Sequence, residues 1–435
     1  MNRPSKVARV AAIASASVLV LAACGGGGDD GDPKAKSGQN IPIYFVDGNT
    51  ADYSKDFDAG TLEGVKATYP GAELGDDFKK RLAEVAPDLK DYTYGPESYD
   101  GVIVAALAAA IAGNDNSKAI AEEMQNASAE GEKCTTYADC LKLIDAGTDI
   151  DYEGVSGPIN FNGTGSPSSA TIGIFEYAND NTYKPLNFQN GEVTSGGEPI
   201  DGQSIEGDIP KGDGEFVVGS LLPQTGDLAF LGPPEIAGVD LAVKDINEAG
   251  GVLGKDAKHV KADSGDGTPN IAPSETDKLL AANADIILGA ASSSVSLSVI
   301  DKIVNAGVLE ISPANTSTAF DTYKDKGLYF RTAPSDVLQG RVMATLVAED
   351  GAKNIAVLAR QDSYGEALAD NVEKFFTESG GKVAIKELYA PDAANFTAEI
   401  DAVKAANPDA IVVISFDETK KIIPEMIKKG IGPNK

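Results

Sequence analysis

The sequence has few positive charges and very little histidine. Its 435 residues include 37 lysines and arginines against 66 acidic residues, so the net charge is −29 at neutral pH. A chain of this charge repels phosphate backbones, which argues against nucleic acid as a partner. His259 is the only histidine, and we expect it to have a structural or surface role. The length predicts two or three domains of about 150 residues each.

The apolar run near the N-terminus is too short for a transmembrane helix, which needs about 20 apolar residues. It reads VAAIASASVLVLAA and follows Arg3, Lys6 and Arg9, as in a secretory signal. The small-residue sequence LAAC then ends on Cys24, and a flexible Gly/Asp-rich stretch follows it. This pattern resembles a bacterial lipoprotein signal over residues 1–23, with lipid on Cys24 and a tether over residues 24–40. An ordinary secretory signal with a chance cysteine is the alternative.

Cysteine is scarce as well, because only Cys134 and Cys140 follow Cys24. They lie in EKCTTYADCLK, where a metal site would need further cysteine or histidine side chains nearby. In an exported protein a disulfide is the usual state of such a close pair. We therefore expect a Cys134–Cys140 disulfide that closes a surface loop, and no metal or other cofactor.

Motifs of exported enzymes are also missing. The serine-rich segment GAASSSVS has no G-x-S-x-G elbow around it. The segment DSGDGT, residues 263–268, resembles a calcium loop only loosely, since it lacks the spacing and the terminal glutamate. We therefore expect a protein that is not an enzyme.

From Glu215 onward, apolar strands alternate with amphipathic helices. The first strand lies in EFVVGSLL and the first helix in PPEIAGVDLAVKDINEAGG. The alternation continues to the last helix, and the short strand in LYFRT separates two series. Strands and helices that alternate in this way predict α/β lobes with parallel, doubly wound sheets, and two series predict two lobes.

The last helix is not followed by the strand that its end predicts. Four apolar residues form one face of this helix: Ile422, Ile423, Met426 and Ile427. Three residues then end it: Gly430, Gly432 and Pro433. The strand in IPIYFVDGN, residues 41–49, has no element before it and would complete this helix–turn–strand unit. We expect it to lie in the same sheet as DAIVVIS, residues 409–415, with Ile41 near Lys435.

Together these segments resemble the type I periplasmic binding proteins, specifically the branched-chain amino-acid receptors of ABC importers. The resemblance covers about residues 41–190 and 215–435 and rests on LLPQTGDLAFLGPPEIAGVDLAVKDINEAGG, GAASSSVS, ISPANTS, RQDSYGEALADNVEKF and YFVDGN. The family has the segment from Glu215 first and the segment from Ile41 second, so the chain resembles a circularly permuted member. A tandem of two unrelated half-domains is the alternative, although neither half would bury its sheet alone.

The resemblance implies two lobes joined by a hinge, as in a Venus flytrap. Lobe one would combine residues 72–157 with 215–334, and lobe two would combine residues 41–71, 158–190 and 335–435. Residues 191–214 are acidic and rich in glycine and proline, which is typical of a linker. This linker would join the family's original termini, since a permutation requires ends that lie close together.

Serines and a threonine follow two of the predicted strands, where open α/β lobes bind ligands and helix N-termini offer N–H groups to anions. In GAASSSVS the resemblance assigns Ser293 to a ligand carboxylate, with Ser292 or Ser294 as the alternatives if the register slips. A simple helix cap is the other interpretation. In ISPANTS the resemblance assigns a backbone contact to Ala314, and it assigns contacts through the N–H and the hydroxyl to Thr316.

The opposite wall of the expected cleft would come from the second lobe. The resemblance assigns Tyr364 a ligand contact, although a tyrosine at such a junction is otherwise commonly a packing residue. Asp47 would bind the ligand ammonium, in a position where the family frequently has the longer glutamate. Phe416, where relatives often carry tyrosine, would line the side-chain pocket. Phe230 and Leu231 are further pocket candidates, with core packing as the open alternative.

The resemblance implies a monomeric receptor outside the cytoplasm, anchored to the bacterial membrane by lipid on Cys24. We expect it to bind a small, branched-chain amino acid between its lobes, to close over the ligand and to deliver it to an ABC permease. The alternatives are a receptor for an amide, urea or an aromatic acid, a sensor ectodomain, and an exported enzyme.

Overall fold

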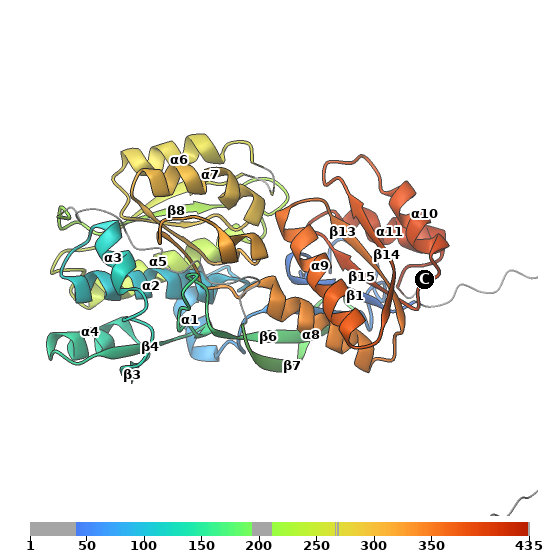
Figure 1. Cartoon of the computed structure of the whole chain (residues 1–435), viewed down its shortest axis with the longest axis horizontal. Coiled ribbons are helices and arrows are strands. Elements are labelled where there is room, and N and C mark those ends of the chain that lie inside the picture. The colour runs from blue at the N-terminus through green and yellow to red at the C-terminus, as the bar shows by residue number, and fades with distance from the viewer. Residues whose placement is uncertain (1–40, 194–210, 266, 268, 434–435) are drawn as a thin grey trace, which may run out of the picture. The chain divides into compact units, whose positions relative to one another are not determined.

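The computed structural model describes residues 41–193, 211–265, 267 and 269–433 (Figure 1). The expected signal peptide, Cys24, the tether, most of the expected linker and Lys435 lie outside the described residues. The described residues belong to one compact unit. Within these ranges, every helix is too short or too polar to cross a bilayer.

A seven-stranded sheet contains strands from both ends of the sequence. Its order is β14 (Lys382–Tyr389), β13 (Asn354–Arg360), β15 (Ala410–Ile414), β1 (Ile43–Val46), β2 (Lys66–Pro70), β6 (Ser169–Tyr177) and β7 (Tyr183–Glu192).

Strand β1 runs parallel to β15, with Ile43 opposite Ile411, and parallel to β2 on its other side (Figure 1). The expected pairing of the first strand with residues 409–415 is therefore confirmed. The permuted order itself remains a proposal.

The far edge of this sheet corrects the expectation of parallel strands. Strand β6 is antiparallel to both β2 and β7, so the sheet is mixed. The connection from β6 to β7 is a tight turn in which Asn181 has a positive φ of 59°. Such a short connection permits only antiparallel neighbours, because a parallel pair needs a crossover of about a dozen residues. Strand β7 also runs two residues into the segment expected as a linker.

A five-stranded sheet forms from the first alternating series. Its order is β12 (Tyr329–Arg331), β11 (Leu309–Ser312), β10 (Ile286–Gly289), β8 (Val217–Leu222) and β9 (Lys258–Asp263). All four pairings are parallel, as the sequence predicts.

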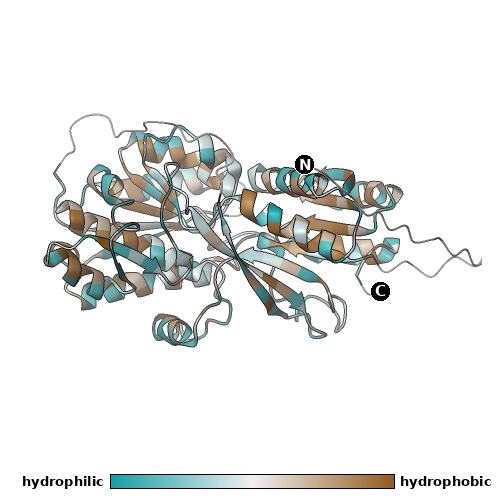
Figure 2. Cartoon of the chain, turned by 60° about the horizontal axis from the view of Figure 1, so that its bottom comes forward, coloured by the Kyte–Doolittle hydropathy of each residue, from teal (hydrophilic) through white to brown (hydrophobic). Residues whose placement is uncertain are grey.

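Helices surround both sheets, and Figure 2 shows that they carry both hydrophilic and hydrophobic residues, while many of the strands are mainly hydrophobic. They are α1 (Asp76–Val85), α2 (Gly95–Ala112), α3 (Ser117–Glu123), α4 (Tyr137–Asp145), α5 (Gly232–Glu248), α6 (Ala272–Ala281), α7 (Ser293–Asn305), α8 (Asp336–Glu349), α9 (Ser363–Glu378), α10 (Thr397–Ala405) and α11 (Thr419–Lys429). Helix α2 packs against α5, and its residues 102–109 are fully buried. This agrees with its sequence, since a helix that is apolar on all sides is stable only in a core.

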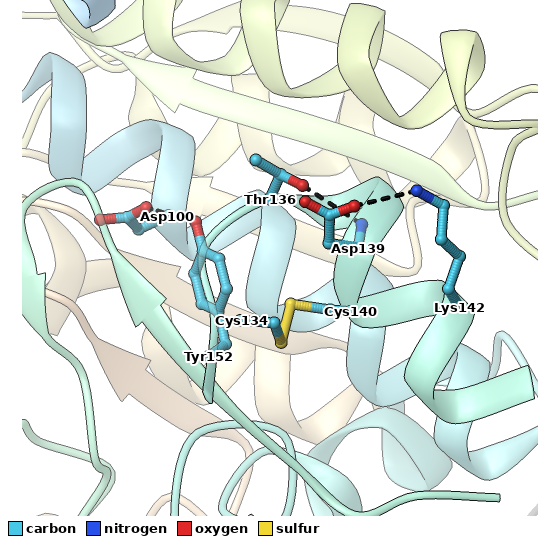
Figure 3. Close-up of a disulfide and its surroundings, with 7 residues drawn as sticks. All are labelled: Asp100, Cys134, Thr136, Asp139, Cys140, Lys142 and Tyr152. Atoms are coloured by element: carbon cyan, nitrogen blue, oxygen red, sulfur yellow. Dashed lines mark hydrogen bonds and ion pairs between the residues drawn. A yellow bond between two sulfur atoms is a disulfide. The ribbon is translucent and has the colours of Figure 1, made fainter. Parts of the chain in front are cut away.

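A small third sheet carries the disulfide. It consists of β3 (Glu132–Cys134), β4 (Ile150–Gly154) and β5 (Gly157–Pro158). Cys134 at the end of β3 is bonded to Cys140 on α4, which confirms the expected pair (Figure 3). Thr136 caps α4 by accepting a hydrogen bond from the N–H of Asp139 at 3.2 Å. The disulfide therefore holds the first turn of α4 against β3, at the edge of this sheet.

Candidate functional site

The candidate site lies where several parallel strands end. The 3-10 helix η1 (Asp47–Asn49) directly follows β1, and helix α9 begins three residues after β13. On the five-stranded sheet, α7 begins four residues after β10. Ligands of open α/β sheets bind at such carboxyl ends of strands.

A cavity of about 20 Å³ joins these strand ends. Its walls come from segments that follow strands of both sheets and from the residue before α2. They are Asp47, Gly48, Tyr94, Leu228, Leu231, Ala291, Ser292, Ser293, Ala314, Tyr364 and Phe416. The volume suffices for one water molecule, so an amino acid can enter only after the walls move apart.

The structure brings seven of the ten expected ligand contacts to this cavity: Asp47, Leu231, Ser292, Ser293, Ala314, Tyr364 and Phe416. It places the other three elsewhere. Ser294 accepts a hydrogen bond from the N–H of Ser363 at 3.2 Å. Phe230 is half-buried and packs on the apolar cluster around the seven-stranded sheet. Thr316 is fully buried, and its carbonyl accepts a hydrogen bond from the N–H of Asp336 at 2.7 Å.

The serines at the start of α7 have side chains that do not cap this helix. Ser292 stands at the N-cap position, but its hydroxyl donates to the carbonyl of Gly267 at 3.1 Å. The Ser293 hydroxyl accepts a bond from the N–H of Ser317 at 3.4 Å. The N–H groups at the start of a helix favour an anion when no side chain caps them. This end of the cavity therefore suits a carboxylate.

Asp47 supplies a buried carboxyl group to the opposite wall. It is 6% exposed, and its backbone has a positive φ of 42°. Burial raises the pKa of Asp47 to about 7, and the hydrogen bond from Tyr94 opposes this rise. Among the described residues, Asp47 pairs with no lysine, arginine or histidine. A ligand cation would supply the partner that this carboxylate lacks.

Tyr94 is a residue of the cavity that the sequence reasoning missed, and the buried Glu97 lies close to it in the first turn of α2. The hydroxyl of Tyr94 donates a hydrogen bond to Asp47, and Tyr94 precedes α2 in a left-handed conformation with φ 58°. Glu97, in the first turn of α2, is 4% exposed. Desolvation raises its pKa to about 8, and the charges of Asp100 and Asp47 add to the rise. No motif in TYGPES indicates these roles, because they arise from the packing of α2.

Stacked rings form the apolar wall. The rings of Tyr364 and Phe416 are nearly parallel, at 10°, with centroids 5.3 Å apart. The Arg360 guanidinium lies 3.5 Å from the Phe416 centroid and donates to Glu418 at 2.8 Å. The Tyr364 hydroxyl accepts a bond from the N–H of Gly48 at 3.2 Å. These contacts hold both rings in place.

Gly48 is required by this arrangement. A Cβ atom at this position would lie 2.4 Å from the Phe416 ring and 3.1 Å from the Ser415 carbonyl. Any side chain here would therefore displace Phe416, which lines the cavity.

Known proteins resemble this chain over about half of its length. The family model of the periplasmic binding proteins matches residues 215–434. A leucine-, isoleucine-, valine-, threonine- and alanine-binding protein of Pseudomonas aeruginosa is 34% identical over 185 residues, 42% of this chain and 49% of that protein. A Leu/Ile/Val-binding protein homolog of Brucella suis is 31% identical over 223 residues, 50% of this chain and 58% of that protein. The chain thus spans about half the length of the curated relatives it matches.

Solved structures also resemble parts of the fold. A leucine-binding protein of Thermotoga maritima has a TM-score of 0.45 at 23% identity, covering 50% of this chain and 61% of that one. A solute-binding protein of R. palustris in complex with benzoate has the same score, identity and coverage.

Proposed function

Because the chain belongs to the periplasmic binding protein family, we propose that it is an extracytoplasmic receptor for a small, branched-chain amino acid. The observation that carries this proposal is the composition of the 20 Å³ cavity. One wall suits a carboxylate, the facing wall has a buried acid without a cation, and the rest is apolar. These three parts of the cavity match the carboxylate, the ammonium group and the apolar side chain of an aliphatic amino acid.

The α-carboxylate would bind at the start of α7. The hydroxyl of Ser293 and the first N–H groups of α7 would donate to it, with the backbone of Ala314 beside them. Thr316 would contribute only after a rearrangement, since it does not line the cavity in this conformation.

The α-ammonium would bind at Asp47. A buried carboxylate without a cation is unfavourable, and an ammonium removes that penalty. This argues against an aromatic acid as the ligand, because such a molecule brings a negative charge and no cation to Asp47. Urea and neutral amides also leave the carboxylate without a charged partner.

The ligand side chain would contact Leu228, Leu231 and the stacked rings of Tyr364 and Phe416. These residues supply no charged group, which favours an aliphatic side chain. The relative from Pseudomonas aeruginosa, named for binding leucine, isoleucine, valine, threonine and alanine, supports the same ligand class.

Binding would depend on opening and closing of the walls. Segments that follow strands of the two sheets contact each other beside the cavity, where the Ser317 hydroxyl donates to the Ser363 carbonyl at 2.7 Å. We propose that the two sheets are the cores of two lobes, divided as the sequence predicts. A ligand that bridges both walls would favour the closed state by its difference in affinity for the two states.

The wider setting is proposed on the same basis. The receptor would deliver its ligand to an ABC permease, and lipid on Cys24 would hold it at the membrane. The parallel pairing of β1 with β15 and the match of the family model to the second part of the chain support a circularly permuted order.

A thermal-shift screen of the purified protein tests the proposal, since a ligand that binds only the native state raises its melting temperature. The screen compares leucine, isoleucine, valine, threonine and alanine with benzoate, urea and acetamide. We expect the largest shift with an aliphatic amino acid, and we expect the same amino acid to give a much smaller shift in the Asp47→Asn variant. If benzoate raises the melting temperature of both the wild type and Asp47→Asn, the ligand is an aromatic acid and the proposal of an amino acid is wrong.

A further inference from the structure

A second and larger cavity shares Tyr94 with the proposed amino-acid site. Its volume is about 400 Å³, within the range of about 300–1,000 Å³ that is typical of small-molecule sites. We call it the aromatic pocket, after the six rings that line it: Tyr69, Tyr92, Tyr94, Phe175, Tyr183 and Phe188. Nothing in the proposed receptor function uses it.

The rings are arranged around Phe175. Tyr69 stacks on Phe175 with centroids 4.7 Å apart, and Tyr183 meets it edge-on at 5.3 Å. Phe188 also meets it edge-on, at 6.0 Å. Aromatic residues form 6% of the sequence but six of the nineteen residues around this pocket. They come from β2, β6, β7 and the segment before α2, so only the fold collects them.

Acidic side chains outnumber basic ones around the same pocket. Four acidic side chains line it, from Asp52, Glu73, Asp91 and Glu97, against the two ammonium groups of Lys79 and Lys90. Glu97 is mostly protonated at neutral pH, since burial raises its pKa to about 8, so the acidic excess comes from the other three. The Lys79 ammonium already lies 6.0 Å from the centre of the Tyr92 ring. A cation near aromatic faces is attracted by their quadrupoles, and the excess of carboxylates adds to this attraction.

We propose that the aromatic pocket binds an organic cation, an ammonium ion substituted with apolar groups. The rings would contact its apolar groups, and the carboxylates would balance its charge. An anion is disfavoured by the excess of acids, and a small hydrated metal ion would leave the rings without contacts. This inference does not depend on the identity of the ligand beside Asp47.

Choline tests the inference against its neutral isostere, in which carbon replaces the quaternary nitrogen. Calorimetric titration of the full chain gives both affinities, and the chain's lack of tryptophan makes tyrosine fluorescence a second readout. We expect choline to bind about tenfold more tightly than the isostere, the difference that a cation–π contact supplies. Equal affinities, or tighter binding of benzoate, would overturn the proposal.

Variants locate the binding. Tyr92→Leu and Phe188→Leu each change a half-buried ring of the pocket, and we expect both to weaken choline binding about tenfold. Tyr323→Leu is the matched control, since Tyr323 is half-buried and lies outside the pocket. A melting curve of each variant verifies folding.

Asp47→Asn separates this inference from the proposed function. We expect this variant to bind choline normally, even if no amino acid binds to either protein. Choline that is displaced by leucine and lost in Asp47→Asn would occupy the amino-acid site instead, which would contradict the proposal.

Discussion

The hydroxyl of Tyr94 donates a hydrogen bond to the carboxylate of Asp47. This contact joins the end of β1 in the seven-stranded sheet to the start of α2, which packs against α5 beside the five-stranded sheet. In this conformation a neutral donor therefore occupies one side of the acid that we assign to a ligand ammonium.

Replacing Asp47 by asparagine should weaken amino-acid binding by about 2–5 kcal/mol, as when a buried charge loses its partner. Folding should be spared, because burial of the Asp47 carboxylate raises its pKa to about 7 and an amide carries no such desolvation cost. Calorimetric titration and a urea melt of both proteins measure the two effects. Unchanged affinity would mean that the ligand ammonium lies elsewhere.

Amino-acid binding should strengthen as the pH rises through 7. The raised pKa of Asp47, about 7, means that the acid is mostly protonated below this pH, whereas an ammonium requires the carboxylate. Affinity should therefore be about tenfold lower at pH 6 than at pH 8, following the ionised fraction. Titrations across this range test it, and Asp47→Asn should flatten the profile.

The same raised pKa has the opposite effect on stability without ligand. A carboxyl whose pKa is higher in the folded than in the unfolded state stabilises the fold below its unfolded pKa, and this contribution is lost as pH rises through about 7. Urea melts of wild type and Asp47→Asn should therefore diverge in favour of the variant between about pH 4 and pH 7. A constant difference across that range would contradict the assignment of this pKa.

Removal of the Ser293 hydroxyl should weaken binding by about 1.5–3 kcal/mol, the usual contribution of a hydrogen bond to a charged group. Ser298→Ala is the matched control, since Ser298 lies on the exposed side of the same helix and its hydroxyl donates to the Val295 carbonyl. Titrations with leucine compare the two variants. Equal losses of leucine affinity in the two variants would indicate that the Ser293 substitution acts by perturbing helix α7 and not by removing a hydrogen bond to the ligand.

Substitution of Gly48 by alanine should block the site, because its Cβ would lie 2.4 Å from the Phe416 ring. Overpacking of this kind costs about 1–3 kcal/mol. The double variant Gly48→Ala/Phe416→Leu should recover part of the affinity, since the smaller side chain leaves room. A double-mutant cycle measured by calorimetry tests this coupling, and strictly additive losses would contradict it.

Replacing both Cys134 and Cys140 by serine should lower the free energy of unfolding by about 2 kcal/mol, the loop-closure entropy of a short loop. Leucine affinity should not change, because neither residue lines the cavity. Urea melts measure the free energy of unfolding, and calorimetric titration measures the leucine affinity. Mass spectrometry of the wild type tests whether Cys134 and Cys140 are free thiols.

Much of the secondary structure could be predicted from local patterns. Strands such as β8 and β10 are short apolar runs, and helices such as α5 have apolar residues on one face. The spacing of the apolar residues therefore predicts whether such a segment is a strand or a helix. Strand β7 is different. Its side chains are mostly half-exposed or exposed, so its sequence lacks the alternation that indicates a strand, and only its pairing with β6 makes it one.

The α/β class, the position of β1 beside β15 and the disulfide could be predicted from the amino-acid sequence, since these depend on local periodicity, on an incomplete helix–turn–strand unit and on close spacing. The resemblance to the family also indicated Asp47, Ser293 and Tyr364, which stand at strand ends, where a parallel sheet gathers its functional groups. The tertiary structure alone decided which side chains face the cavity. The Tyr94 hydroxyl donates to Asp47, and the Thr316 carbonyl accepts a hydrogen bond from the N–H of Asp336, because helix packing and the meeting of the two sheets orient them. These are contacts between residues far apart in the chain, and no periodicity encodes them.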